Sequence, residues 1–234
     1  MPGQRVRQPF SCLAKAACCA IAALLYVALG VSQKVRSLLW VVPLSVLIIG
    51  YLLGSIPFGL ILTRMSGAGD LRTIGSGSIG ATNVLRIGRK GLAAATLLLD
   101  AGKGVAAVLI AEAIQPGLGA MAGLAALVGH CYPVWLRFNG GKGVATALGI
   151  VLGLKLFVIT LICAGTWLAV LALSRISSVS SLAAVLAAPC AAMALGESRL
   201  VPFLLAVTLL IFWKHRANLG RLTRGEEPKV GQRG

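Results

Sequence analysis

The sequence predicts an all-α fold, a polytopic bundle of about seven core transmembrane helices, some short or re-entrant, plus a possible extra N-terminal hydrophobic helix. Hydrophobic residues make up 58% of the 234 residues, and charged residues only 12%. Long apolar runs in such a composition are typical of membrane spans rather than of a soluble core. A chain of this length forms one compact bundle, with no room for a soluble domain beside it.

The formal net charge of +16 indicates topology and anionic ligands rather than nucleic acid. Lys and Arg gather at the ends of apolar segments, as the positive-inside rule describes, and form no basic stripe interleaved with aromatic residues. The six cysteines show no CxxC spacing, and most fall in apolar stretches. We therefore expect no nucleic-acid partner, no disulfide, no metal site and no cofactor.

The N-terminal extension, residues 1–37, has three possible interpretations. Its apolar stretch, 16–30, follows a basic stretch, as in a membrane anchor, a cleaved signal peptide or a mis-assigned translation start. Because the stretch is short for a span and is followed by Lys34 and Arg36, we favour the anchor or the mis-assigned start over cleavage. Residues 38–229 are expected to form a single membrane domain, with 230–234 as a tail.

The first predicted span covers residues 38–62, which at about 1.5 Å per residue matches the hydrocarbon core. Pro57 is expected to kink its inner end. The stretch 64–90 that follows is rich in Arg and Lys and has one acidic residue, which assigns it to the cytoplasm. Residues 91–114 then return outward, and 118–134 come back in after a turn at Gln115, Pro116 and Gly117.

The second half of the chain leaves the number of spans open. Residues 147–173 are predicted as a hairpin broken near Lys155, and 182–213 as a hairpin split at 196–198. Each could instead be one long span. The count is seven core spans, or five if both hairpins are single helices, and either count places the C-terminus in the cytoplasm.

Three polar islands interrupt the apolar chain, at residues 75–86, 129–146 and 215–222, and the predicted topology places all three in the cytoplasm. The first, GSGSIGATNVLR, combines glycines that let backbone amides face a ligand with hydroxyls and an Arg suited to phosphate. The alternative is an ordinary glycine-rich loop with an interfacial Arg. Its candidate binding residues are Gly75, Ser76, Gly77, Ser78, Thr82, Asn83 and Arg86.

The second island predicts a loop whose amides lead into a helix N-terminus, which is a cradle for phosphate. It is not a Walker A motif, because the spacing before Lys142 is wrong and no acidic second motif appears. The alternative is a tight turn that needs glycine for steric reasons. Its candidate residues are Gly140, Gly141, Lys142, Gly143 and Thr146.

In the third island, His215 and Asn218 lie three residues apart, so they would share one face of a helix continuing from the last span. The alternative is a His at the membrane interface. Asp100 and Lys103 in an apolar helix are expected to pair at i, i+3 and to face the bundle interior, as a structural pair or as support for the site. For His130, packing is favoured over a role as general base.

Nucleophilic catalysis by the protein is not expected, since no Ser, His and Asp set occurs in the islands. The substrate must then arrive activated. An acyl group on phosphate meets this requirement, because phosphate is a good leaving group and the enzyme mainly binds charge and positions two reactants.

Taken together, the motifs resemble the PlsY family of bacterial membrane acyltransferases, from about residue 40 to 229. The resemblance implies transfer of a fatty acyl group from acyl phosphate to the 1-hydroxyl of sn-glycerol 3-phosphate. The products are lysophosphatidic acid and phosphate, in the first acylation of phospholipid synthesis. The motifs are GSIPFG (54–59), the first island, LDAGKG (99–104), GGKGVAT (140–146), SRISSVSSL (174–182) and HRANLGRL with the following Gly225, Glu227, Pro228 and Lys229.

The resemblance also implies roles for single residues. It implies that the catalytic residues are Ser76, Arg86, His215 and Asn218. The glycines of the second island would form the acyl-phosphate loop, with Lys142 as a phosphate ligand. Glu227 would be a structurally important glutamate. Ser78 departs from the family, which usually has Asn there, although a hydroxyl still donates and accepts hydrogen bonds.

The resemblance further implies seven helices in the bacterial plasma (inner) membrane and no direct use of acyl carrier protein or coenzyme A. The alternative function is a membrane transporter of a phosphorylated anion, which would also use broken helices, but no matching halves are visible in the chain. The proton acceptor is expected to be an oxygen of the substrate phosphate.

Overall fold

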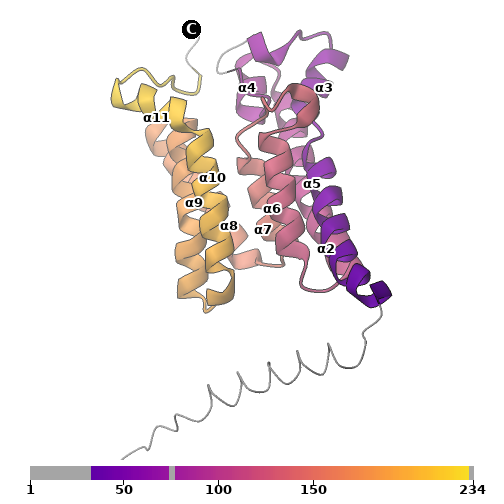
Figure 1. Ribbon diagram of the computed structural model, residues 1–234. Coiled ribbons are helices and arrows are strands. Elements are labelled where there is room, and N and C mark those ends of the chain that lie inside the picture. Colours follow the sequence, from indigo (N-terminus) through magenta and orange to yellow (C-terminus); the bar gives the residue numbers. More distant parts are fainter. Residues whose placement is uncertain (1–32, 74–76, 232–234) are drawn as a thin grey trace, which may run out of the picture. The chain divides into compact units, whose positions relative to one another are not determined.

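The computed structural model describes residues 33–73 and 77–231 of the chain, with side chains from Trp40 onward. The chain divides into two compact units, Met1–Pro43 and Leu44–Gly234. Most of the N-terminal extension, including the apolar stretch 16–30, lies outside the described residues. Within the second unit, all of the elements that the structure describes are helical (Figure 1).

The apolar helices follow the expected order along the chain. They are α2 (Gln33–Gly54), α5 (Lys90–Ile114), α6 (Gly119–Cys131), α7 (Val144–Gly153), α8 (Phe157–Ser174), α9 (Ser177–Ala194) and α10 (Val201–Lys214). Shorter elements are α3 (Phe58–Met65), α4 (Ala81–Arg86), α11 (Arg216–Thr223) and the 3₁₀ turns η1 (Leu71–Thr73), η2 (Val134–Leu136) and η3 (Ser198–Leu200).

Both predicted hairpins are present as pairs of separate helices, so neither stretch is one long span. The first is broken between α7 and α8, where Lys155 has a left-handed backbone with φ 62°. The second is broken between α9 and α10. Among the described residues, five helical segments are long and apolar enough to cross a bilayer, or six if α10 and α11 form one bent span, and α7 is a shorter apolar helix.

The helix of the first span is interrupted where the sequence predicted a kink. α2 ends at Gly54 and α3 begins at Phe58, with Pro57 between them. Proline has no amide hydrogen to continue the helical ladder, so carbonyls of the preceding turn are left to find other donors. Within the break, the carbonyl of Ile56 accepts hydrogen bonds from the amide of Phe58 and from Lys103 on α5.

Glycines hold α5 close to α7, and α2 close to α6. A Cβ at Gly104 would collide with the backbone of Thr146, and one at Gly149 with the carbonyl of Ala101. The same holds for Gly54 of α2 against Ala126 of α6. Small residues let helix backbones approach this closely in membrane proteins. α8 packs on α9, and α9 on α10, as a second set of neighbouring helices (Figure 1).

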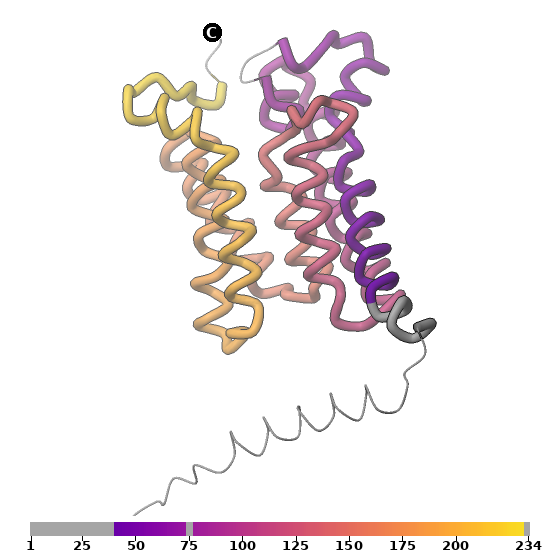
Figure 2. Tube along the Cα trace, viewed as in Figure 1, coloured from indigo at the N-terminus to yellow at the C-terminus, as the bar shows by residue number. Residues whose placement is uncertain are grey.

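The chain turns sharply between α10 and α11, by 59° (Figure 2). The prediction of one helix continuing through His215 is therefore wrong. The amide of His215 lies 3.0 Å from the carbonyl oxygens of both Ile211 and Phe212, a tightening that is common where an α-helix ends. His215 and Asn218 are nevertheless both buried.

Candidate functional site

A cavity of about 360 Å³ brings parts of the three islands together. One end of it is polar, and is lined by residues of α4, of the loop before α7, of the start of α9 and of the bend between α10 and α11. The other end is apolar and runs between α7, α8, α9 and α10. The predicted site residues that line it are Ser78, Thr82, Asn83, Arg86, Asp100, Lys142, Gly143, His215, Asn218 and Glu227.

The first island contributes its second half to this cavity. Arg86, at the end of α4, lines the cavity and forms no ion pair or hydrogen bond within the described part of the chain. The side-chain amide of Asn83 donates to the carbonyls of Leu71 and Ser78, at 3.0 and 2.9 Å, and so shapes the loop. Gly77 has φ +66°, a conformation that favours glycine.

Gly75 and Ser76 lie outside the described residues, so their predicted roles stay predictions. The hydroxyl of Thr82 lies 3.2 Å from that of Ser177 at the start of α9. The first island thereby contacts a helix that follows it by about 95 positions in the chain.

The second island forms a tight loop between α6 and α7. The amides of Gly140 and Gly141 donate to the carbonyls of Cys131 and His130, at 3.2 and 3.0 Å. These two amides are therefore occupied by the end of α6, and the amides that lead into α7 begin with Lys142. A Cβ at Gly141 would collide with the ring of His130, so this part of the loop needs glycine for steric reasons.

Thr146, also predicted to bind substrate, is fully buried in α7 and does not line the cavity. Gly143 does line it, with φ +84°. Substrate binding by Gly140, Gly141 and Thr146 therefore stays a prediction, since the structure places them behind the cavity wall.

Lys142 joins the second island to the third. Its ammonium nitrogen lies 2.6 Å from Oδ1 of Asn218, and Nδ2 of Asn218 donates to Oε1 of Glu227 at 2.5 Å. Burial lowers the pKa of Lys142 to about 8, since the attraction of Glu227 is offset by Arg221 and Arg86. The negative charge near Lys142 is thus too small to compensate for the burial of its protonated form.

Glu227 holds this end of the cavity together. Oε1 also accepts from the hydroxyl of Ser178 at 2.8 Å, and Oε2 from Nε of Arg221 at 2.7 Å. Burial alone would raise the pKa of Glu227, but the hydrogen bonds from Asn218, Ser178 and Arg221 hold it below its usual range. The carboxylate is therefore ionised and committed to its neighbours.

His215 is fixed in one tautomer by its surroundings. Its Nδ1 lies 2.8 Å from the carbonyl oxygen of Ile211. A carbonyl can only accept, so Nδ1 carries the proton and Nε2 of the neutral ring is left as an acceptor. The ring lines the cavity together with Asn218.

Sequence reasoning assigned no role to Ser177 and Ser178, although both line the cavity. The serines of SRISSVSSL, which lie at the start of a span, are the sequence feature that could have indicated polar lining from this helix. Their contacts cross from α9 to α4 and to the C-terminal segment, and such pairings depend on the packing of distant helices.

The predicted pairing of Asp100 with Lys103 is confirmed. Lys103 Nζ lies 2.6 Å from Asp100 Oδ1, and both side chains are buried. Asp100 lines the cavity as well. The pair therefore lies beside the cavity, and a supporting role at the site stays a prediction.

The cavity's apolar end is lined by Leu97, Val151, Ala164, Trp167, Leu168, Ala188 and Leu204, among others. At its polar end lie Lys142, which is partly buried, and Arg86, which is exposed, whereas the carboxylate of Glu227 is already paired with Arg221. An anion held between Arg86 and Lys142 would be stabilised by charge-assisted hydrogen bonds. The geometry thus suits a molecule with a phosphate and a long apolar tail.

The family model described as glycerol-3-phosphate acyltransferase matches residues 44–225. This chain belongs to the glycerol-3-phosphate acyltransferase family. It is 61% identical over 187 residues to a glycerol-3-phosphate acyltransferase of Novosphingobium aromaticivorans, covering 80% of this chain and 94% of the relative. It is 55% identical over 187 residues to one of Erythrobacter litoralis, with the same coverage of both chains.

Two crystal structures of PlsY (YgiH), an integral membrane glycerol 3-phosphate acyltransferase, have the same fold. The glycerol 3-phosphate form has a TM-score of 0.76 at 36% identity, over 81% of this chain and 96% of that one. The lysophosphatidic acid form has a TM-score of 0.74 at 35% identity, over 81% and 95%. This family member is therefore an integral membrane acyltransferase, as the sequence motifs predicted.

Proposed function

We propose that this acyltransferase uses acyl phosphate as its donor. It transfers the acyl group to the 1-hydroxyl of sn-glycerol 3-phosphate and releases lysophosphatidic acid and phosphate. The observation that carries the proposal is the cavity itself, in which Arg86 and Lys142 line an end that continues into an apolar arm. The existence of PlsY structures in glycerol 3-phosphate and lysophosphatidic acid forms supports the acceptor and the product.

The two phosphates are assigned to different parts of the polar end. Lys142 and the free amides at the start of α7 bind the phosphate of the donor, because a helix N-terminus favours negative charge. Arg86 offers its planar fork to a phosphate as well. His215 and Asn218 hold glycerol 3-phosphate, while the proton of the attacking 1-hydroxyl stays free to pass to the leaving phosphate.

The acyl chain lies in the apolar arm between α7, α8, α9 and α10. Each buried methylene contributes about 0.8 kcal/mol to binding, so the chain anchors the donor while the polar end orients its carbonyl. No acyl carrier protein or coenzyme A takes part directly. The described residues contain neither a separate docking domain nor a cluster able to hold a metal ion.

The reaction is a single acyl transfer. The 1-hydroxyl oxygen attacks the carbonyl carbon, and a new C–O ester bond forms as the bond from that carbon to the phosphate oxygen breaks. The hydroxyl proton passes to an oxygen of the leaving phosphate, so no protein carboxylate is needed as a base. Lys142, Arg86 and loop amides stabilise the developing negative charge.

The test is an assay of the purified protein in detergent. Palmitoyl phosphate with glycerol 3-phosphate is expected to give lysophosphatidic acid and inorganic phosphate in equal amounts, with phosphate release dependent on glycerol 3-phosphate. Palmitoyl coenzyme A or palmitoyl acyl carrier protein in place of the acyl phosphate is expected to give no product. Turnover with either of these donors would refute the proposed donor, and uptake by proteoliposomes without chemistry would indicate a transporter.

We also propose that the polar end of the cavity and the C-terminus face the cytoplasm in the bacterial plasma membrane. The positive-inside rule supports this orientation, since the loops at this end are rich in Arg and Lys. Single cysteines placed at Asn139 and Arg224 in a cysteine-free chain are expected to react with an impermeant maleimide only after the cells are opened. Labelling of either position in intact cells would overturn the orientation.

A further inference from the structure

The buried ion pair of α5 calls for an explanation beyond packing. Asp100 and Lys103 are 3% and 5% exposed, inside an otherwise apolar helix. Desolvating two charges costs several kcal/mol per ion in proteins, and well-packed apolar residues often serve stability as well or better. Intramembrane charges of this kind mark functional sites. The proposed reaction assigns neither residue a role.

One end of the pair is tied to the break in the first span. Lys103 Nζ donates to the carbonyl oxygen of Ile56 at 2.9 Å. That carbonyl belongs to the segment between α2 and α3, next to Pro57. The GSIPFG motif thus supplies an acceptor for the LDAGKG motif, and the acceptor holds Lys103 in place.

The other end points to His130 in the last turn of α6. Asp100 Oδ1 lies 3.6 Å from His130 Nδ1, so the carboxylate lies beside the ring but beyond hydrogen-bond distance. His130 is 3% exposed and lines the cavity, and its Nδ1 has no hydrogen-bond partner in the part of the chain that the structure describes.

His130 in turn contacts the glycine loop in two ways. Its carbonyl accepts the amide of Gly141 at 3.0 Å. Its ring fills the space that a Cβ of Gly141 would need. The position of His130 therefore sets the position of Gly141, and Lys142 is the next residue of the loop.

We propose that Lys103, Asp100 and His130 act as positioning residues for the loop 140–143, and so set the affinity for acyl phosphate. This polar chain runs from the carbonyl of Ile56 through the ion pair to the His130 ring and ends at Gly141. This positioning role rests on the proposed function, in which the loop holds the phosphate of the donor. None of the three residues is required to touch the reacting atoms.

The test compares variants of the chain with a matched control on the same helix. His130→Gln and Asp100→Asn are each expected to raise KM for palmitoyl phosphate about tenfold, equivalent to ~1.4 kcal/mol. KM for glycerol 3-phosphate is expected to change by less than about twofold, since the loop mainly contacts the donor. Activity of the wild-type protein with palmitoyl phosphate is established first, so a failure of the proposed function is seen separately.

The double variant Asp100→Asn/Lys103→Met separates positioning from stability. Asp100→Asn alone leaves Lys103 without its carboxylate and is expected to lower the melting temperature, whereas the double variant removes both charges and restores it. KM for palmitoyl phosphate is expected to stay raised in the double variant, because the link to Ile56 is lost. If Asp100→Asn does not fold, the KM values of the double variant and of His130→Gln test the proposal.

The control is Glu112→Gln, near the opposite end of α5. Glu112 accepts from the amides of Gly117 and Gly119, at 3.0 and 2.8 Å, so its loss is expected to lower the melting temperature with both KM values unchanged. An equal rise of both KM values in the His130 and Asp100 variants would overturn the proposal. So would an unchanged KM for palmitoyl phosphate, or its return to the wild-type value in the double variant.

Discussion

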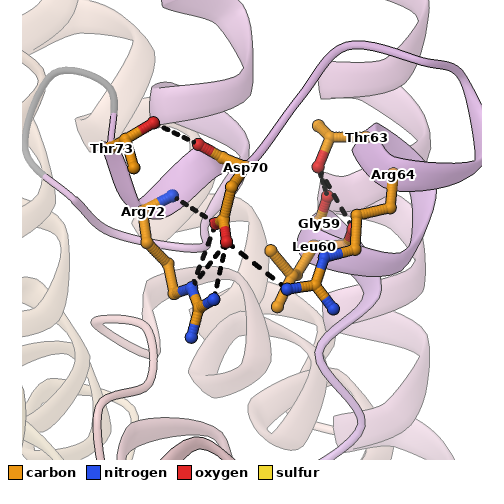
Figure 3. A network of polar contacts seen from close by, with 7 residues as sticks. All are labelled: Gly59, Leu60, Thr63, Arg64, Asp70, Arg72 and Thr73. Carbon is orange, nitrogen blue, oxygen red and sulfur yellow. Dashed lines mark hydrogen bonds and ion pairs between the residues drawn. The ribbon is translucent and has the colours of Figure 1, made fainter.

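Two clusters in which cationic side chains surround one carboxylate, one on the surface and one at the cavity, differ in their exposure. On the surface, Asp70 accepts from Arg72, with Nη2 at 2.6 Å, and from Arg64 at 3.4 Å (Figure 3). Both arginine side chains are about half exposed, 43% and 57%. The hydrogen bonds from Arg72 lower the pKa of Asp70 well below its usual range. Water solvates whatever charge is left over.

In the cavity, Lys142 is linked through Asn218 to Glu227, which already accepts from Ser178 and Arg221. Burial lowers the pKa of Lys142, because water solvates its ammonium group less than it would at the surface. The partial burial of Lys142, rather than the number of arginines, therefore distinguishes this site from the exposed cluster at Asp70. Substitutions can test this distinction.

The largest difference is expected between two arginines. Arg86→Ala is expected to lower kcat/KM about 100-fold or more, the range found when one donor to a developing charge is lost. Arg72→Ala, the matched surface control, is expected to change kcat/KM less than about twofold, because exposed ion pairs contribute little. Initial rates with palmitoyl phosphate and glycerol 3-phosphate measure both. Equal losses of kcat/KM in the two variants would contradict a special role of Arg86 at the cavity.

A smaller effect is expected from pH. Only protonated Lys142 binds phosphate, and its pKa is lowered to about 8. kcat/KM reports the free enzyme, so it should be constant below pH 8 and fall about tenfold per pH unit above it. Lys142→Arg keeps its charge at high pH and should remove this alkaline fall. If kcat/KM of Lys142→Arg still falls above pH 8, a group other than Lys142 causes the fall.

The apolar arm should give an effect that grows with chain length. Ala164→Phe on α8 fills part of the arm, so each methylene that no longer fits should cost about fourfold in affinity, from ~0.8 kcal/mol per methylene. The KM for palmitoyl phosphate should rise more than that for decanoyl phosphate. Leu173→Phe, an exposed position on the same helix, is the control. A uniform rise for both donors would place the acyl chain elsewhere.

The smallest effect is expected at the surface carboxylate. Asp70→Asn should leave the melting temperature and activity unchanged, whereas Glu227→Gln should lower both, because its buried hydrogen bonds have no solvent to replace them. Thermal unfolding in detergent with activity assays measures the pair. A marked loss in Asp70→Asn would show that the surface network supports the fold more than its exposure suggests.

Much of the fold followed from the sequence. The break at Pro57, the hairpin at Lys155 and the turn at 115–117 were predicted from proline, glycine and single charges in apolar runs. These are local properties. The bend at His215 was missed because a helix can end there without proline or glycine, and an apolar pattern does not record a change of direction.

The site was predicted in part, for the same reason. Residues within the islands were found, since glycine, hydroxyl and cationic side chains cluster along the chain. The roles of Ser177 and Ser178 and the link from Asp100 to His130 were not, because they arise where separate helices pack. The amides of Gly140 and Gly141 were expected to face a ligand, and the end of α6 takes them instead.

Glu227 lies beyond the last apolar helix, in the segment after α11. A chain that ended before it would insert all of its membrane spans in the usual order. It would nevertheless leave Asn218, Ser178 and Arg221 without their shared acceptor. The segment after α11 is synthesised last, so the polar end of the cavity is complete only once Glu227 has bonded to α9 and α11.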